Sequence, residues 1–341
     1  MPTTYPLSVL DLAPIVQGST PAESFKNTIQ LAQQADQAAF TRYWLAEHHG
    51  MIGIASAATS VLIAHVGHHT RRIRIGAGGI MLPNHSPLVI AEQFGTLAAL
   101  FPDRVDLGLG RAPGSDQRTA QALRRNLQSD PNEFPHDVLE LLDYMSDHPQ
   151  QPVPAVPGKG SNVPVWILGS SLFGAQLAAM LGLPYAFASH FAPAQMMDAI
   201  AVYRQHFKPS HYLQKPYVML GFNVFAAETN EKAHYLASSW QQSFVSLRQG
   251  KPIQLPPPVA NYIERAGALG QAVMDHALSC AAIGDLPAII EQTQAFIDKT
   301  GADELMVTCN MYDQRARLHS YALLAEAQKH LRHAPSALDF A

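Results

Sequence analysis

Short apolar, β-branched segments alternate along the chain with longer segments in which apolar residues recur at helical spacing. The first kind predicts buried strands, and the second predicts amphipathic helices. The predicted strands are Leu7–Leu12, Arg42–Ala46, Ile73–Gly79, Arg104–Gly110, Val163–Leu168, Tyr185–Ser189, Val218–Ala226 and Glu304–Cys309. The predicted helices are Ala22–Ala39, Ala55–His68, Pro87–Leu100, Glu133–Asp147, Ser171–Leu181, Pro193–Phe207, Asn230–Leu247, Leu286–Thr300 and Asp313–His333.

Strands that are each followed by a helix predict an α/β fold, a (β/α)8 TIM barrel, with a doubly wound open sheet as the alternative. Two long connections, His148–Pro164 and Arg248–Tyr262, are rich in proline. The alternation continues in phase after each, so we expect one domain over residues 1–341 and interpret both connections as insertions in the barrel. Long insertions often form lids or binding loops.

The composition limits the class of protein. The chain has 341 residues, 47% hydrophobic and 15% charged, which is enough for a large core. A net charge of -4 gives no reason to expect a nucleic acid partner. No apolar run reaches the roughly 20 residues of a membrane span, and the first residues do not have the pattern of a signal peptide. Two cysteines, Cys280 and Cys309, are too few for a disulfide framework. We therefore expect a cytoplasmic protein without membrane contact.

Histidines follow the second predicted strand, in the sequence Glu47-His48-His49. The residues that follow the strands of a TIM barrel form its catalytic face. Neighbouring residues of an extended segment point to opposite sides, so both imidazoles cannot enter one pocket, and we expect no metal site. A single imidazole suits proton transfer, while a pair of surface histidines is the alternative. The motif His65–His69 lies at a helix end, which places it on the opposite face of the barrel.

Glycines follow the third and fourth strands. Three glycines within Gly76–Gly79 predict close approach of a flat molecule to the backbone, or else a bulge or tight turn. Arg111 stands beside the glycines of the fourth strand, where a guanidinium suits an anion. After the fifth strand, Gly169, Ser170 and Ser171 begin a helix whose free N–H groups favour phosphate, with plain capping as the alternative. Together these residues predict a flat organic cofactor that carries a phosphate.

Four segments in this order resemble the bacterial luciferase-like flavin monooxygenases, in particular the single-chain, alkanal-monooxygenase-like proteins. They are "YWLAEHHG", "IRIGAGGIMLPNHSPLVIAEQFGTLAAL", "RVDLGLGRAPG" and "WILGSS". The resemblance extends from about Leu7 to Thr308. It implies a TIM barrel that binds FMN at its mouth, and an oxidoreductase that uses reduced FMN and O2 to oxidise a small or medium organic substrate.

The resemblance also implies roles for single residues. His48 matches the catalytic histidine of luciferases. The third-strand glycines match a segment that lies against the flavin ring and often has a non-proline cis peptide, here at Gly78–Gly79 or a neighbour. The residues that would bind the cofactor are Ala77, Gly78, Gly79, Arg111, Gly169, Ser170 and Ser171. Gly110 stands where luciferase has a reactive cysteine, and Gly169 where it has a glutamate, so bioluminescence is not expected and the substrate stays open.

Two other functions are possible at this stage, an F420-dependent hydride-transfer oxidoreductase and a flavin-binding protein without turnover. For the monooxygenase, we expect a separate flavin reductase to supply reduced FMN. Met81, Leu82 and Phe191 are candidates for an apolar pocket wall. The helices Ala55–His68 and Pro87–Leu100 are apolar on more than one face, which predicts a homodimer.

Overall fold

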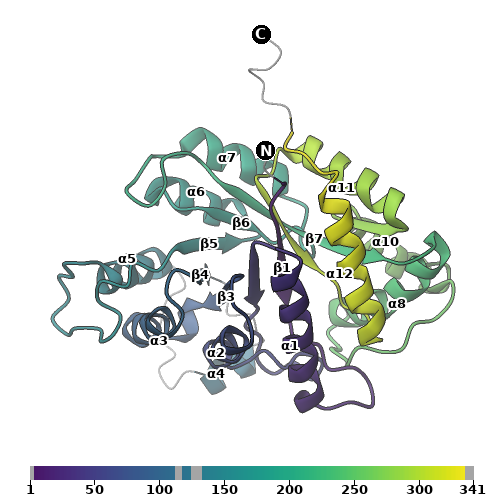
Figure 1. Cartoon of the computed structure of the whole chain (residues 1–341), viewed down its shortest axis with the longest axis horizontal. Coiled ribbons are helices and arrows are strands. Elements are labelled where there is room, and N and C mark those ends of the chain that lie inside the picture. The colour runs from purple at the N-terminus through teal and green to yellow at the C-terminus, as the bar shows by residue number, and fades with distance from the viewer. Residues whose placement is uncertain (1–3, 112–116, 124–132, 335–341) are drawn as a thin grey trace, which may run out of the picture.

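A closed barrel forms the centre of the molecule (Figure 1). The computed structural model describes residues 4–111, 117–123 and 133–334, and within them eight parallel strands complete the barrel. Each strand from β1 to β7 pairs with the next, β7 pairs with β9, and β9 returns to β1. The barrel strands are β1 (Leu7–Asp11), β2 (Arg42–Leu45), β3 (Arg74–Met81), β4 (Val105–Gly110), β5 (Val165–Gly169), β6 (Tyr185–Phe187), β7 (Val218–Ala226) and β9 (Glu304–Thr308). The predicted barrel is confirmed, and closure excludes the open sheet.

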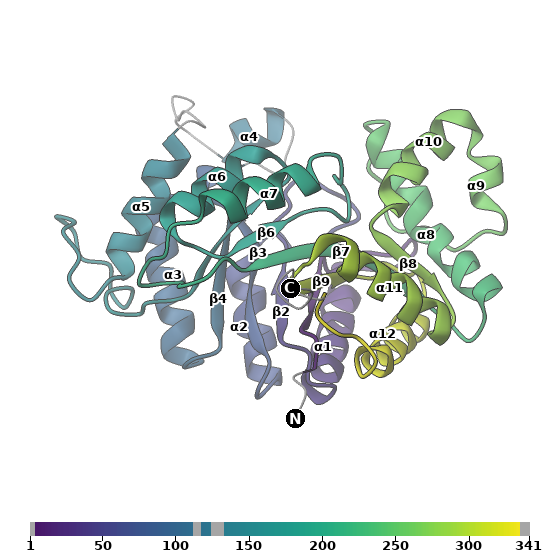
Figure 2. The ribbon, with the colours of Figure 1, turned by 90° about the horizontal axis from the view of Figure 1, so that it is seen from above.

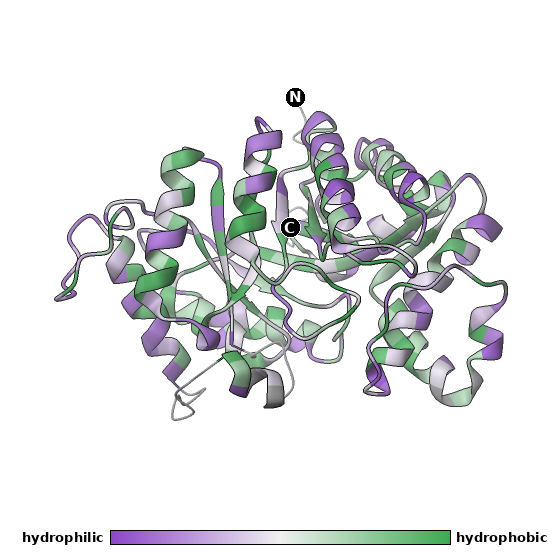
Figure 3. Cartoon of the chain, turned by 90° about the horizontal axis from the view of Figure 1, so that it is seen from below, coloured by the Kyte–Doolittle hydropathy of each residue, from purple (hydrophilic) through white to green (hydrophobic). Residues whose placement is uncertain are grey.

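Helices surround the barrel with their apolar residues directed toward the strands (Figure 3). Local signals fix several ends. The Thr20 hydroxyl accepts from the Glu23 amide at the start of α1, and Gly301 ends α11 with a φ of 59°. The outer elements are α1 (Pro21–Gln37), α2 (Thr59–His69), η1 (Leu82–Asn84), α3 (Pro87–Leu100), α4 (Gln117–Leu123), α5 (Phe134–Met145), α6 (Leu172–Leu181), α7 (Met196–His206), α8 (Asn230–Arg248), α9 (Tyr262–Arg265), α10 (Gly267–Leu278), α11 (Leu286–Thr300) and α12 (Gln314–Gln328).

The barrel interior is polar at the end where the strands begin. Arg42 lies between two buried carboxylates, 2.8 Å from Asp106 and 2.9 Å from Glu304. Above this network the rings of Trp44 and Trp166 meet edge to face, with centroids 5.4 Å apart. Charges this deep are tolerated because each has an oppositely charged partner. The interior is therefore filled at this end, and a ligand site within the barrel must lie toward the carboxyl ends of the strands.

Several elements differ from the predictions. Strand β8 (Ala281–Gly284) was missed, and it pairs with the last part of β7 outside the closed barrel. The sequence Ala-Ala-Ile-Gly has a single β-branched residue among alanine and glycine, so it lacks the composition that predicts a strand. The helices α4, α9 and α10 were missed as well, and α10 begins in the glycine-containing sequence Gly-Ala-Leu-Gly. The predicted helix Ala55–His68 begins only at Thr59. Figure 2 shows α8, α9 and α10 grouped on one side of the barrel.

In the part of the chain that the structure describes, no helix combines the length and apolar character that a membrane crossing requires.

Candidate active site

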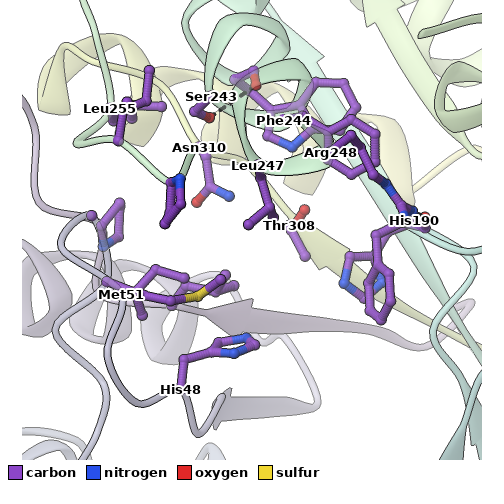
Figure 4. A pocket seen from close by; sticks show the side chains of 18 residues that line it. His48, Met51, His190, Ser243, Phe244, Leu247, Arg248, Leu255, Thr308 and Asn310 are labelled. Atoms are coloured by element: carbon purple, nitrogen blue, oxygen red, sulfur yellow. Dashed lines mark hydrogen bonds between the residues drawn. The ribbon is translucent and has the colours of Figure 1, made fainter. Parts of the chain in front are cut away.

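A cavity of 470 Å³ lies at the carboxyl end of the barrel (Figure 4). Its walls come from the segments that follow β1, β2, β6 and β9, from α8, and from the proline-rich connection after α8. Most of the wall is apolar, and the polar groups are few, as is usual for sites that bind small molecules. The lining residues are Leu12, Pro14, His48, Met51, Gly53, Ile54, His190, Phe191, Trp240, Ser243, Phe244, Leu247, Arg248, Pro252, Ile253, Leu255, Thr308 and Asn310.

The proline-rich connection is fixed over the cavity by backbone contacts. The Leu255 amide donates to the Ile15 carbonyl at 2.9 Å, and the Gln17 amide donates to the Leu255 carbonyl at 2.9 Å. A Cβ on Gly53 would lie 2.3 Å from the Ile253 carbonyl oxygen, so only glycine permits this approach. The connection forms part of the cavity wall, as a binding loop would. That it is an insertion in the barrel stays a prediction.

His48 and His49 separate as the alternation of an extended chain predicts. His48 lines the cavity, and its amide donates to the Ser56 carbonyl at 3.1 Å. The His49 ring instead lies against Glu47, with Nε2 2.7 Å from Oε1. Only His48 of this pair is placed to meet a ligand in the cavity.

Glu47 organises the turn that carries His48. Its side chain is buried and lies 2.9 Å from Nε2 of His85, while Oε2 accepts from the Met81 amide at 3.0 Å. Burial by itself raises the pKa of Glu47, but the hydrogen bond and charge of His85, with the bonds from His49 and Met81, outweigh it and lower the pKa. Glu47 is therefore ionised and ties the end of β2 to the end of β3.

The glycines of β3 have packing reasons within the barrel. A Cβ on Gly79 would lie 2.6 Å from the Gly108 carbonyl oxygen, and one on Gly78 would lie 2.7 Å from Cδ1 of Leu10. The peptide bond Gly78–Gly79 is cis, as the family resemblance implies, and the pairing of β3 with β4 shifts register between Ala77 and Ile80. Ala77, Gly78 and Gly79 are not cavity-lining residues, so their contact with a cofactor stays a prediction.

Arg111 and the start of α6 come together on the β4–β5 side of the barrel mouth. The guanidinium Cζ of Arg111 lies 4.2 Å from the ring centroid of Phe173, in the first turn of α6. Ser171 occupies the N-cap position, but its side chain makes no capping hydrogen bond. A Cβ on Gly169 would meet nothing closer than 3.6 Å, so packing does not require glycine there. With Ser170 between them, these residues form an open helix N-terminus beside a cation, which suits a phosphate.

His190 was missed by the sequence analysis. It follows the predicted strand Tyr185–Ser189, which is the same signal that drew attention to His48. Its carbonyl accepts from Nδ2 of Asn223 at 2.7 Å, and Oδ1 of Asn223 accepts from the Thr308 hydroxyl at 2.7 Å. Burial, with the charge of His48, lowers the pKa of His190 to about 4, so its imidazole is neutral at pH 7.

Two of the predicted pocket-wall residues are elsewhere. Leu82 is fully buried in the core. Met81 packs against Gly110, where an added Cβ would lie 2.9 Å from the Met81 sulfur. Phe191 does line the cavity, as predicted. The motif His65–His69 ends α2, before β3, as predicted.

Within the described residues, one group of side chains has the proximity of a metal site. It consists of His136, Asp137 and Glu140 on α5, and none of them lines the cavity.

Comparison with known proteins adds a family and a set of similar folds. The model of a family described as luciferase-like monooxygenase matches residues 6–304. A luciferase-like monooxygenase of Escherichia coli (strain K12) is 51% identical over 96% of this chain and 98% of its own length. The crystal structure of apo-MsnO8 is 35% identical, covers 96% of this chain and 99% of its own, and superposes with a TM-score of 0.85.

More distant structures share the fold alone. A type II Baeyer–Villiger monooxygenase in complex with FMN is 16% identical, with a TM-score of 0.72, over 98% of this chain and all of its own. An F420-dependent secondary alcohol dehydrogenase is 14% identical, with a TM-score of 0.65, over 97% of this chain and all of its own. One of these two structures holds FMN and the other an F420 adduct.

Proposed function

The chain belongs to the luciferase-like monooxygenase family, and on that premise we propose that it uses reduced FMN and O2 to oxidise a small or medium organic substrate. The observation that carries the choice of a phosphate-bearing flavin is the pairing of Arg111 with the uncapped N-terminus of α6. FMN ends in a single phosphate, and a helix N-terminus beside one guanidinium matches that group.

The proposed FMN site spans two parts of the barrel mouth. Arg111, Gly169, Ser170 and Ser171 would hold the phosphate, and Ala77, Gly78 and Gly79 of β3 would support the ring. Gly169 fits this assignment because packing within the protein does not require a glycine at this position. When bound and reduced, FMN supplies the electrons that activate O2.

His48 is the proposed catalytic residue. Its ring lines the cavity, while Glu47 is engaged by His49, His85 and the Met81 amide and thereby holds the adjacent turn in place. An imidazole at this position can hold and transfer the proton that oxygen insertion requires. The largely apolar wall of the cavity excludes water from that proton transfer.

The function is tested by mixing the protein, loaded with anaerobically reduced FMN, with ¹⁸O₂ and a panel of straight-chain aldehydes, ketones and thioethers, each with and without a terminal carboxylate. We expect one labelled oxygen atom in a product and less hydrogen peroxide than from free reduced FMN. In parallel titrations, we expect FMN to bind and F420 not to bind. Binding of F420 in preference to FMN would favour a hydride-transfer enzyme, and FMN binding without any product over the full panel would favour a flavin-binding protein without turnover.

We also propose two partners. A separate flavin reductase would supply reduced FMN, which predicts turnover only when a reductase and NADH are added to oxidised FMN. The chain would form a homodimer through α2 and α3, a surface on which Val61 is 66% exposed and Leu100 is 60% exposed. Light scattering that gives the mass of a single chain, 37.1 kDa, at all micromolar concentrations would exclude the dimer.

A further inference from the structure

Arg248 is the only formally charged side chain among the described residues that line the cavity. It is the last residue of α8, and two contacts hold its guanidinium in place. Nη2 donates to the Phe191 carbonyl, and Cζ lies 5.0 Å from the ring centroid of Phe244. Within the described part of the chain, no carboxylate lies within ion-pair distance of it. The cavity rim therefore carries a positioned cation without a counter-charge.

His190 places a second hydrogen-bond donor near Arg248, because Phe191, which accepts from Arg248, is the next residue in the chain. Nδ1 of His190 packs against Gly221, where a Cβ would lie only 2.1 Å away, and it has no hydrogen-bond partner among the described residues. A buried N–H without a partner is rare in proteins, which places the ring proton of the neutral imidazole on Nε2. Nε2–H is then the polar group that His190 presents to the cavity, and Figure 4 shows His190 and Arg248 on the same side of it.

Two donors and one positive charge at one side of an apolar cavity define the complementary ligand group. That group has several acceptor lone pairs and a negative charge, and the carboxylate is the smallest organic group that combines both, with one charge to match the one guanidinium. The other walls, which include Leu12, Ile54 and Leu255, offer apolar contact. The volume of 470 Å³ suits a small organic molecule.

We propose, resting on the proposed function, that the substrate is an apolar molecule with a carboxylate, and that Arg248 and Nε2–H of His190 bind this carboxylate. The FMN phosphate is the other possible source of an anion. The seat formed by Arg111 and α6 lies outside the cavity lining, so the two anions have separate sites.

The probes are octanoate and octanamide, which have the same shape and differ in charge. Their affinities are measured by calorimetry with the protein saturated with oxidised FMN. We expect octanoate to bind about three- to tenfold more tightly than octanamide, because an exposed guanidinium gives a modest ion pair and the His190 donor adds to it. Arg248→Met should abolish this preference, Arg248→Lys should keep most of it, and His190→Phe should reduce it.

Lys251→Met is the matched control, because it removes an equal positive charge only three positions along the chain from Arg248. The Lys251 side chain does not line the cavity. This variant should leave the preference unchanged. Equal affinities of octanoate and octanamide in the wild type would overturn the proposal, and so would a preference that survives Arg248→Met. Loss of FMN affinity in Arg248→Met, with the preference intact, would assign Arg248 to the FMN phosphate. Failure of FMN to bind the wild type would reject the proposed function, while the comparison of octanoate with octanamide can still be made on the FMN-free protein.

Discussion

Replacing Arg111 by Met should weaken FMN binding about tenfold. A hydrogen bond to a charged group contributes about 1.5–3 kcal/mol, and the exposure of Arg111 favours the lower end, since water screens the charge. About 1.4 kcal/mol corresponds to a factor of ten in Kd. The Phe173 ring, 4.2 Å from Cζ of Arg111, orients the guanidinium. A cation–π contact at an exposed site contributes about 0.5–1 kcal/mol, so Phe173→Leu should weaken FMN binding about two- to fivefold.

The assay is quenching of FMN fluorescence at several salt concentrations. Arg111→Lys should retain part of the affinity, because a lysine keeps the charge but loses the paired donors of the guanidinium. Arg72→Met is the control, since Arg72 bonds to the Asp36 carbonyl and is exposed on the far side of the barrel, next to the end of α2. An equal Kd in wild type and Arg111→Met, at low and high salt, would refute the phosphate seat.

Three further predictions test the site and the scaffold. His48→Ala should keep FMN affinity, lower the product-forming rate about 10²–10⁴-fold and raise hydrogen peroxide release in stopped-flow oxidation of reduced FMN, whereas His49→Ala should be milder. Gly169→Ala should unfold at an unchanged temperature, because the added Cβ has no atom closer than 3.6 Å. The variant should bind FMN more weakly, and unchanged FMN binding would remove Gly169 from the site. Asp11→Asn should cost about 3–5 kcal/mol in urea unfolding, because it leaves Arg317 buried without its partner at 2.8 Å. Burial raises the pKa of Asp11, but the charge of Arg317 and the hydrogen bonds to Asp11 outweigh burial and lower the pKa. The stabilisation is therefore present above about pH 3.8 and is lost as the pH falls further. This loss should be missing from the pH profile of Asp11→Asn.

The barrel was predictable because its strands are apolar and are separated by helices with a clear period. The eight strands have ends within two residues of the predicted ones. Strand β8 was not predictable, since its four residues pair only with the outer end of β7, and that edge exists only after the barrel has closed. The helices α9 and α10 were missed because the preceding prolines and the glycines of α10 resemble a loop.

The candidate site was predictable in part, for a similar reason. Residues at strand ends are recognisable from the chain alone, so the sequence placed His48 and Arg111 at the barrel mouth, and it could have placed His190 there by the same signal. The chain alone does not show whether a glycine is required by packing or leaves space for a ligand. Gly79 is required by the Gly108 backbone across the sheet, while Gly169 has room for a side chain. Only contacts between strands distinguish the two.

The sequence by itself determined the order of strands and helices, because hydrophobic period and capping residues act over a few neighbouring positions. It also determined that one of two adjacent histidines would leave the pocket, since an extended chain alternates its side chains. Tertiary structure alone decided which residues of the wall meet. Arg248 lies 57 positions from Phe191, to which it donates, and Arg111 lies 62 positions from the ring of Phe173. Such contacts depend on barrel closure, which sets distant segments side by side at one mouth and which no local pattern records.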